Sequence, residues 1–167
     1  MARRIPRRTF VAGAAQAAAL MAVAPGYAAY GSKGFDFLVL GDMHLDRIEH
    51  HDMDWMQREK PTAISQCEVY SRITRETTPR LLAELRRQIE NNDRIRFVVQ
   101  LGDFVQGLAG TPELARVHCA DGVKLVQDAK LGVPFLMTKG NHDITGPGAH
   151  EAFDAVLRPF IAAELAK

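Results

Sequence analysis

Three short apolar runs, each ending in a glycine and followed by polar side chains, constrain the fold of this chain more than any other feature. The first leads into Gly41 and Asp42, the second into Gly102 and Asp103, and the third into Gly140. A nearly continuous apolar run of this length is typical of a strand covered on both faces. Helical spacing separates the runs, so the expected order is strand, helix, strand, helix, strand. This order predicts an α/β fold with a parallel sheet and right-handed crossovers.

The polar residues after the three runs fall at one edge of the predicted sheet. In open sheets of this kind, ligands bind beyond the carboxyl ends of the strands. Side chains that are far apart in the sequence should therefore meet there: Asp42, His44, Asp103, Asn141 and His142. Carboxylate, imidazole and amide oxygen are suitable ligands for zinc, manganese or iron. The sequence thus predicts a metal site at this edge.

Two amphipathic segments supply the predicted helices between the strands. Each has a threonine and a proline typical of an N-cap and a first helical position. Thr78 and Pro79 begin the first helix, and Thr111 and Pro112 begin the second, which we expect to end near Lys130.

Two further segments have no strand pattern. Residues 44–66 combine charged and aromatic side chains without a regular period, which predicts a long functional loop. The tail from Ala149 has helical spacing that we expect to be interrupted at Pro159.

The N-terminus, residues 1–28, is interpreted as an export signal of the twin-arginine type. Arg7 and Arg8 precede an alanine-rich apolar stretch and then small residues suited to cleavage after Ala28. A cut four residues earlier is the second choice, and an uncleaved leader is the alternative. The apolar stretch is shorter than the ~20 residues of a membrane-spanning helix, so we expect no stable membrane anchor. We predict an exported protein, either periplasmic or secreted.

The remaining residues, 29–167, have the composition of one ordinary globular domain. The whole sequence is 47% apolar and 25% charged, which excludes a fibrous or disordered class. Without the four arginines of the leader, 17 basic side chains face 20 acidic ones, a net charge of −3. This balance gives no nucleic-acid-binding signature. Cys67 and Cys119 are interpreted as separate buried thiols, with a disulfide as the alternative.

The three polar motifs resemble those of the calcineurin-like metallophosphoesterases. The family pattern is DxH, then GDxx, then GNH followed by an acidic residue. The matching residues here are Asp42 with His44, Gly102 with Asp103, and Gly140, Asn141, His142 and Asp143. The resemblance covers about residues 35 to 160. It implies that 29–167 is a partial phosphoesterase domain, one half of a layered α/β sandwich whose second sheet is missing.

The resemblance also implies a reaction and a role for each motif residue. Members of the family hydrolyse phosphoesters with two divalent ions, and a metal-bound hydroxide is the nucleophile. The implied ligands are Asp42 and His44 for the first ion, Asp103 as the bridge and Asn141 for the second ion. His142 would stabilise the transition state or protonate the leaving oxygen, and Asp143 would orient its imidazole.

The sequence departs from the family pattern after Asp143. The family continues with a histidine and a GHxH motif, and neither is found here. The second metal would then have fewer protein ligands than the first, and a second chain or an oligomer would cover the sheet. We expect a phosphoester hydrolase of unknown substrate class. An inactive truncated remnant, or a metal- or ligand-binding module of the same fold, is the alternative.

Other polar residues have weaker interpretations. His50, His51 and Asp52 could line a substrate cleft or form an accessory metal site, and a solvated loop is the alternative. Asp52 with Asp54 could form an aspartyl nucleophile pair, but that chemistry requires an aspartate directly after a strand. His150 could replace a missing metal ligand, although no strand precedes it and a solvated histidine is the simpler interpretation.

Overall fold

The structure is a computed structural model that describes residues 34–167. The predicted export signal, residues 1–28, lies outside the described residues. The elements are β1 (Asp36–Leu40), α1 (Met53–Glu59), α2 (Ile64–Asn91), β2 (Ile95–Gln100), α3 (Pro112–Ala129), β3 (Phe135–Met137), α4 (Ala149–Ala152) and α5 (Arg158–Leu165). None of the helices in the described part of the chain is long and apolar enough to cross a membrane.

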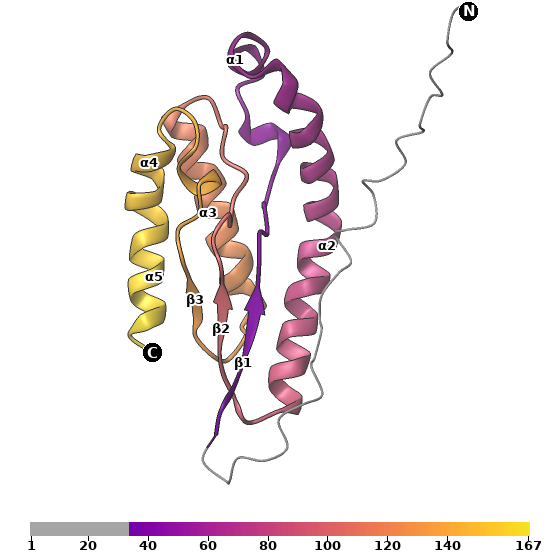
Figure 1. Ribbon diagram of the computed structural model, residues 1–167, viewed down its shortest axis with the longest axis vertical. Coiled ribbons are helices and arrows are strands. Elements are labelled where there is room, and N and C mark those ends of the chain that lie inside the picture. Colours follow the sequence, from indigo (N-terminus) through magenta and orange to yellow (C-terminus); the bar gives the residue numbers. More distant parts are fainter. Residues whose placement is uncertain (1–33) are drawn as a thin grey trace, which may run out of the picture. The chain divides into compact units, whose positions relative to one another are not determined.

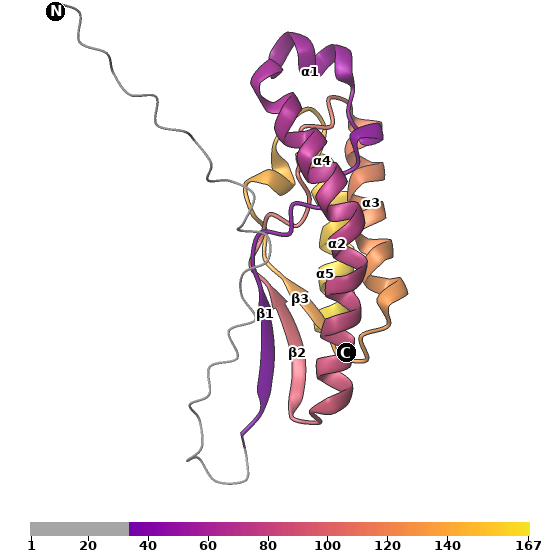
Figure 2. The ribbon, with the colours of Figure 1, turned by 90° about the vertical axis from the view of Figure 1, so that its right-hand side faces the viewer.

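The three strands form one parallel sheet in the order β1-β2-β3, which confirms the predicted α/β alternation (Figure 1). Leu38 is paired with Val98, and Val98 is paired with Phe135. Val98 and Phe135 belong to the main hydrophobic core, and Leu38 packs against it. Figure 2 shows that α2, α3 and α5 lie together on one side of the sheet, so this row of residues packs against the helices.

The opposite face of the sheet is apolar and open. Phe37 and Val39 are 49% and 50% exposed, and Phe35 and Leu101 are each 57% exposed. Phe37 stacks on Phe97 with 5.2 Å between the ring centroids. No part of residues 34–167 covers this face. The expected uncovered face is therefore present, and its coverage by a second chain stays a prediction.

The prediction of a long loop at residues 44–66 was wrong. The segment holds α1 and the start of α2, and α2 passes through Pro79 instead of beginning there. The buried positions in the first half of α2 recur at helical spacing but are small and mostly polar: Cys67, Ser71, Thr74 and Thr78. A search for apolar periodicity cannot detect such a face.

The remaining helices agree more closely with the sequence-based predictions. Thr111 caps α3, because its side chain accepts a hydrogen bond from the backbone N–H of Leu114 at 3.2 Å. The tail is helical, but its irregular part is a π-helical turn at Phe153–Leu157, before Pro159. Proline lacks a backbone N–H, so the helical ladder changes ahead of it.

Candidate metal centre

Two turns bring the residues that follow β1 and β2 to the same place. The backbone N–H of His44 donates to the carbonyl of Asp103, and that of Leu45 donates to Phe104, both at 2.9 Å. Leu45 then pairs with Val105 in an isolated parallel bridge. The sheet order therefore continues beyond the strand ends, as the adjoining segments in Figure 1 show, and fixes His44 beside Asp103.

The backbone at these turns is strained or tightly packed. Asp42, His44 and Asp103 have φ angles of 21°, 42° and 52°, in the left-handed region that side chains rarely adopt. Each costs on the order of 1–3 kcal/mol, and such strain clusters at functional sites. Gly102 has φ 100°, and a Cβ added to it would lie 2.8 Å from the backbone nitrogen of Gly140. Glycine is thus required where β2 and β3 end.

Three predicted site residues meet at this edge. The ligand atoms of His44, Asp103 and His142 lie within 4.8 Å of one another, and all three residues are partly exposed. We call them the rim group. One carboxylate and two imidazoles at this spacing fit a divalent cation. Asp42 and Asn141 border the group in sequence and are exposed, but Asp42 does not converge with it.

One glutamine orients both imidazoles of the rim group. Nδ1 of His44 donates to Oε1 of Gln106 at 2.8 Å, and Nδ1 of His142 donates to the Gln106 carbonyl at 2.9 Å. The Nε2 atom of each ring has no hydrogen-bond partner among residues 34–167. The hydrogen bonds of the two Nδ1 atoms fix the tautomer and the ring orientation of a ligating histidine. Sequence reasoning missed Gln106, whose only signal is its position three residues after Asp103.

The Asp103 carboxylate is also held in place. Its Oδ1 accepts a hydrogen bond of 2.8 Å from the backbone N–H of His142. This bond connects the turn after β2 with the turn after β3 and holds the Asp103 carboxylate beside His142.

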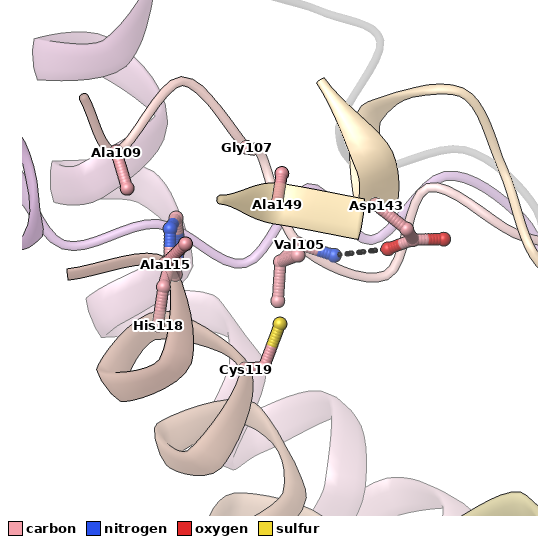
Figure 3. A pocket seen from close by; sticks show the side chains of 8 residues that line it. All are labelled: Val105, Gly107, Ala109, Ala115, His118, Cys119, Asp143 and Ala149. Atoms are coloured by element: carbon pink, nitrogen blue, oxygen red, sulfur yellow. Dashed lines mark hydrogen bonds between the residues drawn. The ribbon is translucent and has the colours of Figure 1, made fainter. Parts of the chain in front are cut away.

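Asp143 does not orient His142 as predicted. Its carboxylate accepts a hydrogen bond from the backbone N–H of Val105 at 3.0 Å (Figure 3). It accepts another from the backbone N–H of Gly140 at 2.8 Å. Burial raises the pKa of Asp143, and these two N–H groups act in the opposite direction. The carbonyl of Gln106 has the role expected of Asp143. Asp143 instead fixes the backbone of the motif that carries His142.

A small cavity of about 10 Å³ lies beside Asp143, with room for about one water molecule. Figure 3 shows Cys119 directed toward Val105 at this cavity. Burial raises the pKa of the Cys119 thiol to about 12, and the charge of Asp143 adds to the effect. Cys119 and Cys67 are both free and buried, which confirms the prediction of separate thiols.

The predicted substrate cleft at His50, His51 and Asp52 was wrong. His50 is 9% exposed and His51 is 6% exposed. Nε2 of His51 lies 2.7 Å from Oδ1 of the buried Asp46. The Asp52 side chain caps α1 by accepting from the backbone N–H of Trp55 at 3.0 Å, so it is not poised as a nucleophile. The buried carboxylate that holds His51 inside is a partner that the sequence does not reveal.

Comparison with known protein families agrees with this geometry. The family model described as calcineurin-like phosphoesterase matches residues 35–164. The matched range contains all three strand-end motifs and Gln106. Searches of curated proteins and of solved structures gave no significant match.

Proposed function

This chain belongs to the calcineurin-like phosphoesterase family, and from that membership we propose that it hydrolyses phosphoric esters with the help of divalent metal ions. The observation that carries the proposal is that the two metal-ligand side chains His44 and Asp103 and the imidazole of His142 converge within 4.8 Å of one another. We further propose a dinuclear centre whose two ions would be held by Asp42, His44, Asp103 and Asn141, the residues that the family motifs place at this edge. The ions, when bound, would supply Lewis acidity to the phosphoryl group and activate water.

The protein's own residues have distinct tasks in this proposal. The Nε2 atom of His44 and the Asp103 carboxylate would hold metal, while the side chain of Gln106 keeps the His44 proton on Nδ1. Because the backbone N–H of His142 donates to Asp103, the imidazole of His142 is held beside the metal-ligating carboxylate, where a phosphoryl group on the ions would lie.

His142 acts on the substrate in this proposal. Its Nδ1 proton is fixed by the Gln106 carbonyl, so Nε2 is the atom that faces the reaction. There the imidazolium form, which carries a proton on both ring nitrogens, would stabilise charge on the phosphoryl oxygens or pass its Nε2 proton to the leaving oxygen, and would become a neutral ring with the proton on Nδ1. The partial exposure of the rim group allows a phosphoester to reach it.

Hydrolysis of p-nitrophenyl phosphate, measured with added Mn²⁺ or Zn²⁺, tests the proposal. His142→Ala and Asp103→Asn should each lower kcat/KM by about 100-fold or more, since a general acid contributes roughly 10²–10⁴. His150→Ala is the matched control, because His150 is exposed and pairs with Asp154 at 3.7 Å. A metal-loaded protein without turnover would overturn the hydrolase proposal and favour the metal-binding module.

We also propose that the protein is exported, on the basis of the sequence of residues 1–28 alone. Cell fractionation of the full-length chain should place it outside the cytoplasm, and substitution of both Arg7 and Arg8 by lysine should retain it inside. Intact mass would then show removal of the leader at Ala28. Retention of the wild-type chain in the cytoplasm would contradict the proposal.

A further inference from the structure

A second set of metal-ligand side chains lies inside the molecule, apart from the rim group. Ligand atoms of Asp46, His51 and Cys67 lie within 4.8 Å of one another. Their exposed fractions are 0%, 6% and 0%. Asp46 and His51 lie between β1 and α1, whereas Cys67 lies on the buried face of α2. We call these three residues the buried group.

Asp46 carries a buried oxygen without a partner. Its Oδ1 accepts hydrogen bonds from the backbone N–H of Arg47 and from Nε2 of His51, each at 2.7 Å. Its Oδ2 has no hydrogen-bond partner among residues 34–167. Proteins seldom leave a buried carboxylate oxygen unpaired, because its lost hydration is then uncompensated.

Other unpaired polar atoms gather around the same residues. In the described part of the chain, four buried side-chain atoms lack a hydrogen-bond partner: Asp46 Oδ2, His50 Nδ1, Gln106 Nε2 and His118 Nδ1. The His118 ring lies 5.7 Å from that of His51, and its Nε2 lies 3.6 Å from Asp46 Oδ1. The unsatisfied polar atoms of the interior are thus concentrated at one place.

The orientation of His51 is that of a metal ligand. Nδ1 of His51 lies 2.9 Å from the carbonyl of Leu108 and must donate to it, because a carbonyl oxygen can only accept. Nε2 is therefore the nitrogen directed toward Asp46 and Cys67. Histidines that ligate metals commonly donate their other N–H to a backbone carbonyl in this way.

We propose that Asp46, His51 and Cys67 form a second metal site, which binds one structural Zn²⁺ ion. Carboxylate, imidazole and thiolate are each ligands that zinc takes in proteins, and the free Asp46 Oδ2 or a water can supply the fourth position. The ion ties the segment before α1 to α2. The proposal of this site does not rest on the hydrolase activity proposed for the rim group.

The exchange of protons for the ion leaves the interior neutral. In the metal-free protein both ring nitrogens of His51 face acceptors, so its imidazolium balances the Asp46 carboxylate, and Cys67 is a neutral thiol. Binding of Zn²⁺ releases the Nε2 proton of His51 and the thiol proton of Cys67. Two positive charges then balance one carboxylate and one thiolate, with no net charge buried.

Binding of Co²⁺ alone, as a spectroscopic probe, tests the buried group directly. The full-length protein, refolded without metal and then titrated with Co²⁺, should develop a sulfur-to-cobalt charge-transfer band with tetrahedral visible bands. Cys67→Ser should remove the charge-transfer band. Cys119→Ser is the matched control, because Cys119 is also buried and free but lies outside the group, and it should keep the band.

A second measurement leaves the buried group intact and so does not depend on its variants folding. In the double variant His44→Ala with Asp103→Asn, the rim group is disabled, and metal analysis should still find one zinc per chain. No zinc in this variant, no charge-transfer band in the wild type, or a band that persists in Cys67→Ser would each overturn the proposal. Catalytic failure of the rim group alone would not affect either readout.

Discussion

The rim group and the buried group contain similar side chains in opposite surroundings. His44, Asp103 and His142 are partly exposed and follow the ends of three strands, where the backbone is strained. The side chains of the buried group are shielded from solvent, and they connect the segment between β1 and α1 to α2. The imidazole and carboxylate groups at the sheet edge can therefore exchange ligands with solvent and take part in a reaction. Those in the interior have no access to solvent and stabilise the fold.

The largest expected difference concerns stability. Asp46→Ala would leave the His51 imidazolium buried without its carboxylate, and breaking a buried ion pair in this way costs about 3–5 kcal/mol. Asp103→Asn, its counterpart in the rim group, should cost about 1 kcal/mol or less, because Asp103 is partly exposed and asparagine can keep the hydrogen bond. Urea denaturation of the metal-free proteins measures both. Equal losses would mean that the two groups do not differ in structural role.

The next effect concerns metal affinity at the sheet edge. Gln106→Leu removes the acceptor for Nδ1 of His44 but keeps the backbone carbonyl that binds His142. Loss of such an orienting contact typically weakens metal binding about 10–100-fold, which isothermal titration with Mn²⁺ would detect. Gln127→Leu on the exposed side of α3 is the control. An unchanged affinity in Gln106→Leu would show that His44 is oriented by something else.

A smaller effect should appear at alkaline pH. Burial raises the pKa of both Cys67 and Cys119 from 9.0 to about 12. Above pH 9 the unfolded chain loses thiol protons that the folded chain keeps. The free energy of unfolding should therefore fall as pH rises from 9 toward 12, by up to about 1.4 kcal/mol per pH unit for each thiol.

Comparison of variants isolates each thiol. In metal-free protein, Cys67→Ser and Cys119→Ser should each remove about half of the thiol-dependent slope, measured by urea denaturation between pH 9 and 10. If zinc is present and bound by Cys67, that thiol is already deprotonated and its share of the slope should vanish. A slope that zinc does not change would count against the buried site.

The smallest effect is expected at His150, the histidine that sequence alone offered as a replacement ligand. The structure places it on the surface at the start of α4, 3.7 Å from Asp154. His150→Ala should change the free energy of unfolding by about 0.5 kcal/mol or less and leave Mn²⁺ affinity unaltered. A marked loss of affinity would restore His150 as a ligand candidate.

The rim group could be predicted from the sequence because topology alone brings it together. Each of its members lies shortly after an apolar strand, and the carboxyl ends of parallel strands share one edge. The Asp143 contact could not be predicted in this way. Its carboxylate reaches the backbone of Val105 instead of the neighbouring imidazole, and no pattern of residue types specifies which of two nearby donors it will meet.

The buried group and the first half of α2 could not be predicted because their signal is polar. Ser71 accepts a hydrogen bond from the backbone N–H of Ile48 at 2.8 Å, and Thr74 accepts one from that of Asp46 at 3.1 Å. A helix face that binds a loop backbone through hydroxyls has no apolar stripe. The loop in turn gains its irregular conformation from these long-range contacts instead of from its own residues.

Gln106 lies between the two groups, and this position has a thermodynamic consequence. Its side chain holds His44, its carbonyl holds His142, and it also lies beside Cys67, whose pKa it lowers against the larger effect of burial. An ion bound on either side must then act on the same residue. Because linkage is reciprocal, any factor by which interior zinc changes metal affinity at the sheet edge applies equally in the other direction.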